Sequence, residues 1–382
     1  MSRRLPCRDP PGSVVNRFTS DRLLFCRKMC GQEGGAMRAG SNNHPGGMVS
    51  IKDVAERAGV SVATVSNSIN RPDRVSAPTR DRVLSVIDEL GYVRSESARQ
   101  LRTGHSRMVA LLVLDMANPF FVDVARGVED ATRAQDLGLM MCNSGQDEDA
   151  EALYLSLFAE QRVRGVLVTP SDVAGHNLDS FRRHGIPHVL VDRTLDVEDG
   201  CSVSVDDVTG GALAVGHLIE TGHTRIAYIS GPSRLNQCRD RHAGALNAVR
   251  EAGLDDSALS VLEVPSLDVV SGRDAGSRLL GLRSRPTAVF CANDLLALGV
   301  LQAMFAAGVR VPEQMALVGY DDIEFAAAAA VPLTSVRQPA FRIGRTAAEL
   351  LLDETSGDFH THQRVVFDPE LVVRRSTLAR QG

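Results

Sequence analysis

Residues 50–67 read S-I-K-D-V-A-E-R-A-G-V-S-V-A-T-V-S-N, and this stretch decides the fold of the N-terminal part of the chain. Ser50, with an acidic residue three positions later, resembles a capping box and predicts the start of a helix. Gly59 ends that helix, because glycine adopts the left-handed conformation of a helix end without strain. Ser61 then predicts the cap of a second helix, Val62 to about Ile69. Two helices joined by a tight turn form a helix-turn-helix, the motif that places its second helix in the DNA major groove.

A third helix is predicted from about Thr79 to Leu90, capped by Ser76 and ended by Gly91. It is required because a helix-turn-helix cannot bury its apolar face alone. Residues 95–102 follow with S-E-S-A-R-Q-L-R, a short amphipathic stretch. An isolated helix of this length is marginal in water, so we expect it to become ordered only on DNA.

The motifs I-K-D-V-A, G-V-S-x-x-T-V-S, L-G-Y and A-R-x-L-R occur in this order between residues 51 and 102. In order and spacing they closely resemble the lac-repressor (LacI/GalR) family, and the resemblance continues along the rest of the chain. It implies a transcriptional regulator that binds double-stranded DNA through a small all-α helix-turn-helix domain.

The same resemblance implies which residues contact DNA. Val62, Ala63 and Asn67 would face the base edges, with Asn67 suited to adenine. Short polar side chains would contact phosphates and set the register, namely Ser61, Thr64, Ser66 and Asn70. For Thr64 and Ser66, hydroxyls bonded back to their own helix are the alternative.

Leu101 corresponds to the family's hinge leucine, which wedges into the minor groove and kinks the DNA. Ala98 beside it would let two hinge helices pack together, which requires a homodimer and a pseudo-palindromic operator. A core contact is the other interpretation of Leu101.

The net charge of −5 is unevenly distributed along the chain. Residues 1–107 contain 18 Lys and Arg against 10 Asp and Glu, whereas the remaining 275 residues contain 24 against 37. A basic N-terminal part on an acidic body favours DNA binding through one end only. A length of 382 residues also predicts two or three compact units.

The first 47 residues are rich in Arg, Gly and Ser and show little periodicity. For residues 1–48 we predict either a disordered extension or sequence upstream of the true start, with Met37 and Met48 as alternative starts. A zinc knuckle is a further interpretation, although the spacing matches no common zinc site, for Cys7, Cys26, Cys30 and His44.

No run of residues approaches the roughly 18 apolar positions that a membrane helix needs, and the N-terminus has no apolar signal core. Seven scattered cysteines argue against a disulfide framework. We therefore expect a cytoplasmic protein with no membrane contact, no cofactor and no metal site.

From Met108 onward, short Val/Leu/Ile runs alternate with helical segments, which predicts an α/β body of parallel sheets covered by helices on both faces. The expected strands are Val109–Leu114, Gly165–Val168, His188–Val191, Arg225–Ile229, Ala288–Cys291 and Ala316–Gly319. Expected helices include Val208–Thr221, Arg241–Ala252 and Asp294–Ala307, whereas Thr334–Arg337 is interpreted as a crossover between subdomains.

Polar side chains follow several of these strands, where open parallel sheets bind ligands. They are suited to paired hydrogen bonds with neighbouring hydroxyl groups, and an aromatic face beside them would pack on a sugar ring. By resemblance to the periplasmic ribose-binding-protein fold, which the family shares, the effector residues would be Asn118, Phe120, Phe121, Asp192, Arg193, Arg241, Asn293, Asp321 and Gln338.

Each of these residues also has a structural interpretation. Phe121 could belong to the core, and Asp192 could cap a helix. Leu267 stands where pentose binders of this fold tend to have a second aromatic residue, which weakens an assignment to ribose.

The domain organisation that follows has a helix-turn-helix at residues 49–93, a hinge and linker at 94–107, and an effector-binding and dimerisation domain at 108–382. Within this periplasmic-binding-protein-like body we expect two doubly wound subdomains. Subdomain 1 would comprise about residues 108–206 and 338–366, and subdomain 2 about residues 207–335 and 367–382.

The sequence has no dinucleotide-binding glycine pattern, P-loop, nucleophile elbow or histidine cluster, which argues against an enzyme. A transporter's solute-binding protein is disfavoured by the DNA-binding motif. We expect a repressor of carbohydrate-utilisation genes that a small sugar, a monosaccharide or a derivative, releases from DNA. The alternative is a regulator that responds to a phosphorylated metabolite or a partner protein as co-repressor.

Overall fold

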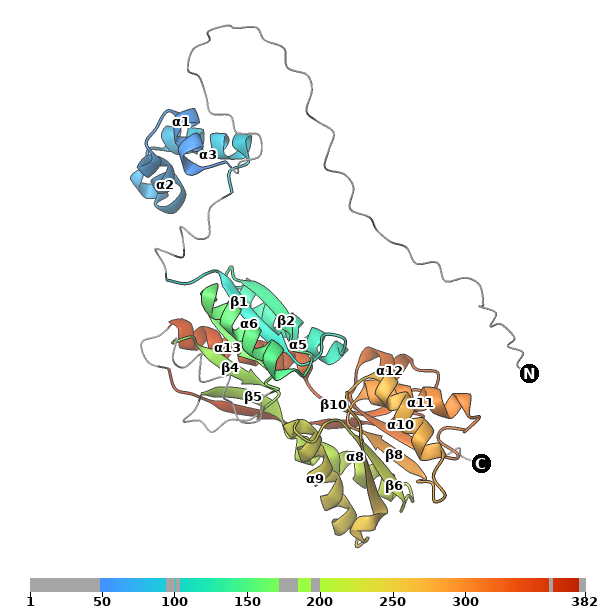
Figure 1. Cartoon of the computed structure of the whole chain (residues 1–382). Helices are drawn as coiled ribbons and strands as arrows, with labels where there is room; N and C mark the ends of the chain where they lie inside the picture. The colour runs from blue at the N-terminus through green and yellow to red at the C-terminus, as the bar shows by residue number, and fades with distance from the viewer. Residues whose placement is uncertain are drawn as a thin grey trace, which may run out of the picture. The chain divides into compact units, whose positions relative to one another are not determined.

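The computed structural model describes residues 49–93, 100, 104–171, 185–193, 200–356 and 360–377. Contacts within the chain divide it into two compact units, residues 1–94 and 95–382. Figure 1 labels many of the helices and strands of both units.

The N-terminal unit contains, in its described part, helices α1 (Ile51–Ala58), α2 (Val62–Asn70) and α3 (Ala77–Leu90) and the 3-10 turn Pro72–Arg74. Local chemistry sets the ends of α1. The Ser50 amide donates to Asp53 Oδ2 at 2.8 Å and the Ser50 hydroxyl accepts from the Asp53 amide, which completes the capping box. Gly59 ends the helix at a φ of 63°.

Helix α3 begins two residues earlier than predicted, at Ala77. Ser76 is its N-cap residue, but the Ser76 hydroxyl donates to Thr79 Oγ1 and accepts no hydrogen bond from a backbone amide of the helix. The three helices enclose one apolar cluster, whose buried members are Val54, Ala55, Ala58, Val65, Val83 and Val86.

In the second unit, sheet A has the strand order β11-β5-β4-β3-β1-β2 with parallel neighbours throughout. Its strands are β1 (Met108–Val113), β2 (Gly138–Asn143), β3 (Gly165–Val168), β4 (His188–Val191), β5 (Cys201–Val205) and β11 (Arg364–Phe367).

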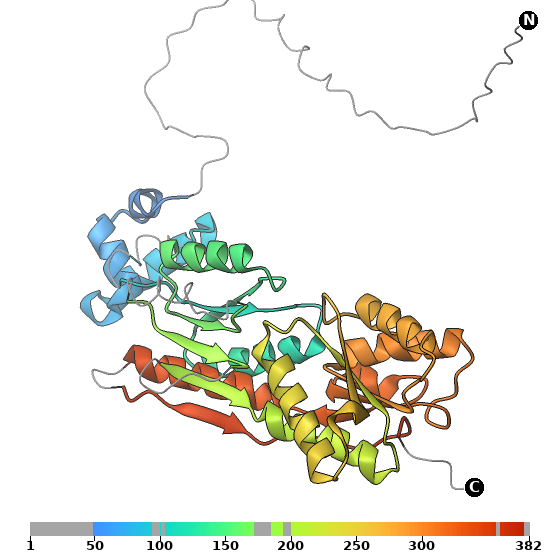
Figure 2. The same cartoon turned by 60° about the horizontal axis from the view of Figure 1, so that its bottom comes forward.

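Both faces of sheet A are covered, as Figures 1 and 2 show. Alternate residues of β1 enter different apolar clusters: Leu111 packs with the cluster that contains α5 (Pro119–Arg133) and α13 (Ala340–Ser356), whereas Leu112 packs with the cluster of α6 (Glu148–Glu160). This burial on both sides explains why the strand is apolar at every position.

Sheet B has the order β12-β10-β9-β8-β6-β7, and β12 pairs antiparallel with β10. Its strands are β6 (Ile226–Ser230), β7 (Leu259–Glu263), β8 (Ala288–Cys291), β9 (Ala316–Asp321), β10 (Thr334–Arg337) and β12 (Glu370–Val372). The helices of this part are α8 (Asp207–Glu220), α9 (Asn236–Glu251), α10 (Val269–Leu280), α11 (Asp294–Ala306) and α12 (Glu324–Ala328), with the 3-10 turn Asp256–Ala258 before β7.

The predicted fold class, a small helical domain and two mostly parallel sheets with helices on both faces, is confirmed. The interpretation of Thr334–Arg337 as a mere crossover is wrong: the segment is strand β10, paired with β9. The sequence analysis also missed β2, β5, β7, β11 and β12. These strands are short or contain polar residues, so their apolar runs are weak.

The chain passes between the two sheets three times within residues described by the structure. It leaves sheet A after β5, returns after β10 into α13, and crosses again between β11 and β12. The space between the sheets is therefore bounded by three adjacent connections, which can act as a hinge.

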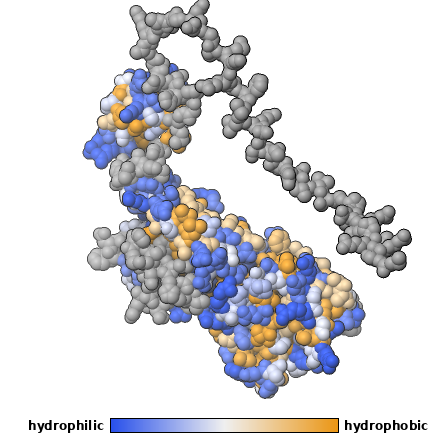
Figure 3. Space-filling view, viewed as in Figure 1, coloured by the Kyte–Doolittle hydropathy of each residue, from blue (hydrophilic) through white to orange (hydrophobic). Residues whose placement is uncertain are grey.

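No helix among the described residues has both the length and the apolar character needed to cross a membrane. On the face shown in Figure 3, apolar surface residues are interspersed with hydrophilic ones.

Helices α8 and α9 pack closely through glycine, which provides a matched test. A Cβ on Gly211 would lie 2.0 Å from the carbonyl oxygen of Arg241, whereas a Cβ on Gly216, in the same helix, meets nothing within 4 Å. We expect Gly211→Ala to lower the free energy of unfolding by about 1–3 kcal/mol or more, because backbone must move. Gly216→Ala should leave it unchanged or raise it by about 1 kcal/mol. Urea denaturation measures both, and equal effects would contradict the close contact.

Candidate functional site

A cleft lies between the two sheets at the carboxyl ends of their strands. Sheet A contributes Leu114, Asp115, Asn118, Phe120, Phe121, Gln146 and Asp192; sheet B contributes Gln237, Arg241, Leu267, Asn293 and Asp321; Gln338 lies in the β10–α13 connection. The empty space, including the part open to solvent, is about 380 Å³. The space accessible to a water-sized sphere is only about 30 Å³, so the cleft is nearly closed in this structure.

The structure brings together all but one of the residues expected to bind an effector. Arg193 is half-buried and is not among the residues that line the cleft. Arg193 directly follows Asp192, whose φ of 59° turns the chain. Asp192 therefore lines the cleft, whereas Arg193 does not.

Four lining residues were not expected from the sequence, namely Leu114, Asp115, Gln146 and Gln237. Leu267, which stands in the place of a second stacking aromatic residue, does line the cleft. Gln237 could have been found. It precedes Arg241 by four residues and so lies on the same helix face, but helix α9 was expected to begin only at Arg241. Gln146 follows β2, a strand that was not predicted.

Arg241 is buried at the base of the cleft. Its Nε donates to Asp207 Oδ1 at 2.7 Å, its Nη1 donates to the carbonyl oxygen of Ala292 at 2.6 Å, and its guanidinium carbon lies 3.6 Å from the ring centroid of Tyr320. Burial opposes the charge, but Asp207, Tyr320 and nearby carboxylates together raise the pKa of Arg241 well above its usual value. The cation is therefore fixed in place, and its first role is structural.

Asp321 joins the two halves of the site. Its Oδ2 accepts from Asn118 Nδ2 at 2.9 Å, across the cleft, and its Oδ1 accepts from Gln338 Nε2 at 2.8 Å. Burial raises the pKa of Asp321 to about 6, against the attraction of Arg241 and these two hydrogen bonds.

Asp192 is linked across the cleft as well, because Gln237 Nε2 donates to its Oδ2 at 3.4 Å. Burial, followed by the charge of Asp207, raises the pKa of Asp192 well above its ordinary value. Within the described residues, Asp192 Oδ1, Gln338 Oε1 and Gln146 Oε1 are buried without hydrogen-bond partners. The cleft thus presents three acceptor oxygens that need donors.

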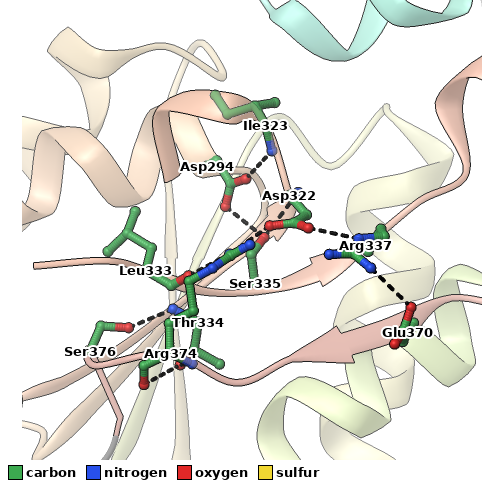
Figure 4. Close-up of polar contacts among 10 residues, drawn as sticks. All are labelled: Asp294, Asp322, Ile323, Leu333, Thr334, Ser335, Arg337, Glu370, Arg374 and Ser376. Carbon is green, nitrogen blue, oxygen red and sulfur yellow. Dashed lines mark hydrogen bonds and ion pairs between the residues drawn. The ribbon is translucent and has the colours of Figure 1, made fainter. Parts of the chain in front are cut away.

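A network in sheet B holds the turn at Asp321 and Asp322, whose φ values are 101° and 56°. Figure 4 shows its contacts around Asp322. The Ser335 hydroxyl donates to Asp294 Oδ1 at 2.7 Å and accepts from the Asp322 amide at 3.0 Å. Asp294 Oδ2 accepts from the Ile323 amide at 2.9 Å. Two consecutive left-handed aspartates are unfavourable, so these bonds maintain the turn that carries Asp321 into the cleft.

Ion pairs secure the outer side of the same turn. The Asp322 carboxylate contacts Arg337 at 2.8 Å and Arg374 at 2.6 Å, and Arg337 also contacts Glu370 (Figure 4).

Asn118 and Asn293 also have structural roles as helix caps. Asn118 Oδ1 accepts from the Phe120 amide, and Asn293 Oδ1 accepts from the Leu296 amide while its Nδ2 donates to the carbonyl oxygen of Leu267. Phe120 and Phe121 are both buried, with ring centroids 5.1 Å apart.

The second helix of the N-terminal unit presents a polar face. Ser61, Val62, Ala63 and Asn70 are exposed, and Thr64, Ser66 and Asn67 are partly exposed, whereas Val65 and Ser68 face the core. Several polar groups are engaged locally: Ser61 and Thr64 pair through their hydroxyls at 2.9 Å, and Asn70 Nδ2 donates to the carbonyl oxygen of Ser66 at 2.8 Å. Ala98 and Leu101 lie outside the described residues.

Together these features define a helix-turn-helix unit attached to a ligand-binding α/β body. Residues 50–95 match the family model described as bacterial regulatory proteins, lacI family, and residues 215–377 match that of a periplasmic binding protein-like domain. The HTH-type transcriptional repressor PurR of Aliivibrio fischeri (strain MJ11) is 37% identical over 336 residues, covering 87% of this chain and 99% of that protein.

Two solved structures are similar over the same extent. The transcriptional regulator CelR in complex with cellobiose is 35% identical, covers 86% of this chain and 99% of that chain, and has a TM-score of 0.63. The lac repressor dimer bound to operator and the anti-inducer ONPF is 27% identical, with 87% and 100% coverage and a TM-score of 0.75.

The chain belongs to the LacI family of bacterial regulatory proteins. It is a DNA-binding transcriptional repressor of that family.

Asp321→Asn tests the electrostatics of the cleft. Because the folded carboxyl binds its proton more tightly than the unfolded one, its stabilising contribution is complete below about pH 4 and is lost as pH rises through about 6. The charge of Asp321 also raises the pKa values of Asp192 and Asp294, which adds in the same direction.

We expect the free energy of unfolding of the wild type to fall relative to that of Asp321→Asn by about 1–3 kcal/mol between pH 4 and 7. Urea denaturation across this range measures it, and Asp274→Asn, an exposed position on α10, is the control. Parallel pH profiles for the wild type and Asp321→Asn would contradict the assignment.

Proposed function

We propose that this repressor is controlled by a small uncharged sugar that binds the cleft and releases the protein from its operator. The observation that carries the proposal is the set of unpaired acceptors at Asp192, Gln338 and Gln146. Sugar hydroxyl groups are donors that satisfy such atoms, and the Phe120 and Phe121 rings offer an apolar wall for the C–H face of a sugar.

The amide orientation of Gln338 is fixed by its bond to the Asp321 carboxylate, so its unpaired atom is an acceptor. Arg241 uses Nε and Nη1 in its hydrogen bonds to the described residues, which makes Nη2 the donor that remains for a ligand. A ligand that both donates and accepts at neighbouring positions, as a polyol does, matches this set.

Charge favours a neutral effector over a phosphorylated one. The cleft is lined by three carboxyl groups, Asp115, Asp192 and Asp321, and by a single arginine that is already paired with Asp207. A phosphate would lie beside Asp115 and Asp321, and only one cation, already paired, would balance its charge. The relative CelR has cellobiose as the ligand of its complex, which also supports a sugar.

The bonds that cross the cleft indicate how the signal is transmitted. Asn118 to Asp321, Gln237 to Asp192 and the Arg234 Nη2 bond to the carbonyl oxygen of Gln146 each join one sheet's side to the other. An effector that replaces these bonds changes the free energy difference between the open and the closed form of the cleft. Through that equilibrium it changes the affinity of the protein for DNA by a corresponding free energy.

In this proposal residues 49–93 bind DNA, 94–107 form the hinge, and 108–382 bind the effector and form a homodimer in the cytoplasm. The two subdomains would be the two sheets with their covering helices. Leu101 would wedge into the minor groove of a pseudo-palindromic operator, with Ala98 at the contact between the hinge helices.

For base recognition we propose Val62, Ala63 and Asn67. No hydrogen bond of the Asn67 side chain occurs among the described residues, so its amide is available to a base. The locally bonded side chains Ser61, Thr64, Ser66 and Asn70 would contact phosphates.

Asn67→Ala should reduce the preference at one base pair of each half-site by about 1–3 kcal/mol, because a bidentate contact to a base is lost. Fluorescence anisotropy on a selected operator and its single-base variants measures this. Asn70→Ala, on the same helix, should weaken binding to all sequences alike. A uniform loss with Asn67→Ala would make Asn67 a phosphate contact.

Thermal-shift measurements on the full chain with pentoses, hexoses, polyols, their phosphates and nucleosides test the effector class. We expect a free sugar to stabilise the protein and to lower its affinity for the operator. A response to a phosphorylated compound alone, to a nucleoside alone, or to no compound would overturn the sugar assignment.

Asp192→Asn then tests the cleft itself. Gln237 donates to one oxygen of Asp192, so the asparagine must turn its own donor toward the ligand or toward Gln237. Asparagine also tolerates the left-handed backbone at this position. We expect the effector Kd to rise at least about tenfold, which corresponds to 1.4 kcal/mol. Titration calorimetry measures it, with Asp274→Asn as the control, and an unchanged Kd would remove Asp192 from the site.

A further inference from the structure

A second cluster of ligating side chains lies at the β11 edge of sheet A. Cys201 is the first residue of β5, Glu354 lies in the last turn of α13, and His360 and His362 belong to the connection between α13 and β11. One potential ligand atom from each of the four lies within 4.8 Å of all the others.

The distances within this cluster match a tetrahedral metal centre. Cys201 Sγ lies 3.1 Å from His360 Nε2 and 3.8 Å from His362 Nδ1. Around zinc, with bonds of about 2.3 Å to sulfur and about 2.0–2.1 Å to nitrogen, tetrahedral angles place sulfur and nitrogen about 3.6 Å apart. The ligand atoms therefore need only small shifts to enclose an ion.

The surroundings of the cluster orient its members. His360 Nδ1 lies 2.9 Å from Asp353 Oδ2, so the carboxylate fixes the ring with Nε2 directed at Cys201. A histidine held by a carboxylate through its other nitrogen is the usual second layer of a zinc site. The Gln363 amide donates to Cys201 Sγ at 3.3 Å and so orients the sulfur. Burial nevertheless raises the pKa of the Cys201 thiol, so the thiol would lose its proton when a metal binds.

Glu354 gives an independent observation that points to a cation as ligand. Its Oε2 is buried and has no hydrogen-bond partner in the part of the chain that the structure describes. Burial raises the pKa of Glu354. A buried, unpaired carboxyl oxygen is costly unless a cation or donor compensates for it.

We propose that Cys201, Glu354, His360 and His362 form a structural binding site for a divalent transition metal ion, with zinc as the best match. One sulfur, two nitrogens and one carboxylate oxygen suit zinc, and four protein ligands leave no open position. Such a site would fasten the α13–β11 connection to β5.

The site is separate from the effector cleft. The β4–β5 register aligns Cys201 with Val189, three residues before Asp192, which is about 10 Å along the strand. A metal here would stabilise the edge of sheet A formed by β11. It would also hold the C-terminal end of α13, whose N-terminal end begins two residues after Gln338 of the cleft.

No metal site was expected here from the sequence, because more than 150 residues separate Cys201 from Glu354, His360 and His362. The only cysteines considered for zinc were Cys7, Cys26 and Cys30, which lie outside the described residues. These three thiols must be removed from any test of the new site.

The experiment uses the full-length chain with Cys7, Cys26 and Cys30 replaced by Ser, stripped of metal and titrated with Co²⁺. We expect one equivalent of Co²⁺ to give thiolate-to-cobalt charge-transfer absorption and the d–d bands of a four-coordinate ion. Zn²⁺ should displace it. Cys201→Ser should abolish the charge-transfer band, whereas Cys142→Ser, a cysteine of β2 outside the cluster, should retain it.

Competition with a chelator then gives the Zn²⁺ affinity. We expect Cys201→Ser and His362→Gln each to raise the Kd at least 100-fold, and zinc to raise the Tm of the parent chain but of neither variant. The two variants alter different segments, so a folding defect in one leaves the other as the test. Absence of the charge-transfer band in the parent chain, or an unchanged Zn²⁺ affinity in His362→Gln, would overturn the proposal.

Discussion

The buried pair of Arg241 and Asp207 organises the base of the effector cleft. The free energy cost of removing the Arg241 guanidinium from water is compensated by the Asp207 carboxylate, by the Ala292 carbonyl oxygen and by the ring face of Tyr320. The pair connects α9 to α8, while Ala292 and Tyr320 belong to the segments at the ends of β8 and β9. Breaking it would leave an uncompensated charge, so the helices and strand ends that line one side of the cleft are held in a fixed arrangement.

The other requirement of the cleft is that its two sides remain able to move. Few hydrogen bonds among the described residues cross it: they join Asn118 to Asp321, Gln237 to Asp192 and Arg234 to the Gln146 carbonyl oxygen. The first two pairs are formed by side chains that also face the empty space. The strained turn at Asp321 and Asp322 is maintained from within sheet B by Ser335 and Asp294. The sheet B side is thus held in a fixed arrangement, and the contacts that a ligand can exchange lie between the two sides, as a switch requires.

The proposed metal site follows the same division. Its ligands all belong to elements of sheet A and its edge, and it would stiffen the α13–β11 connection without crossing the cleft. The effector site, by contrast, draws residues from both sheets. An ion at the edge of sheet A would therefore change the stability of that half of the body. A small molecule in the cleft would instead change the angle between the two halves.

The sequence by itself determined the helix-turn-helix, because Ser50, Gly59 and Ser61 act within one turn of their own position. It also determined the α/β body and most of the cleft, since polar residues after buried strands meet at one edge of a parallel sheet. Local patterns could not find β10 or the short polar strands, whose pairing depends on distant partners. Only the tertiary structure decided that Arg241 is held by Asp207, that Arg193 lies outside the cleft lining, and that Cys201 lies beside His360, because these contacts join segments far apart in the chain.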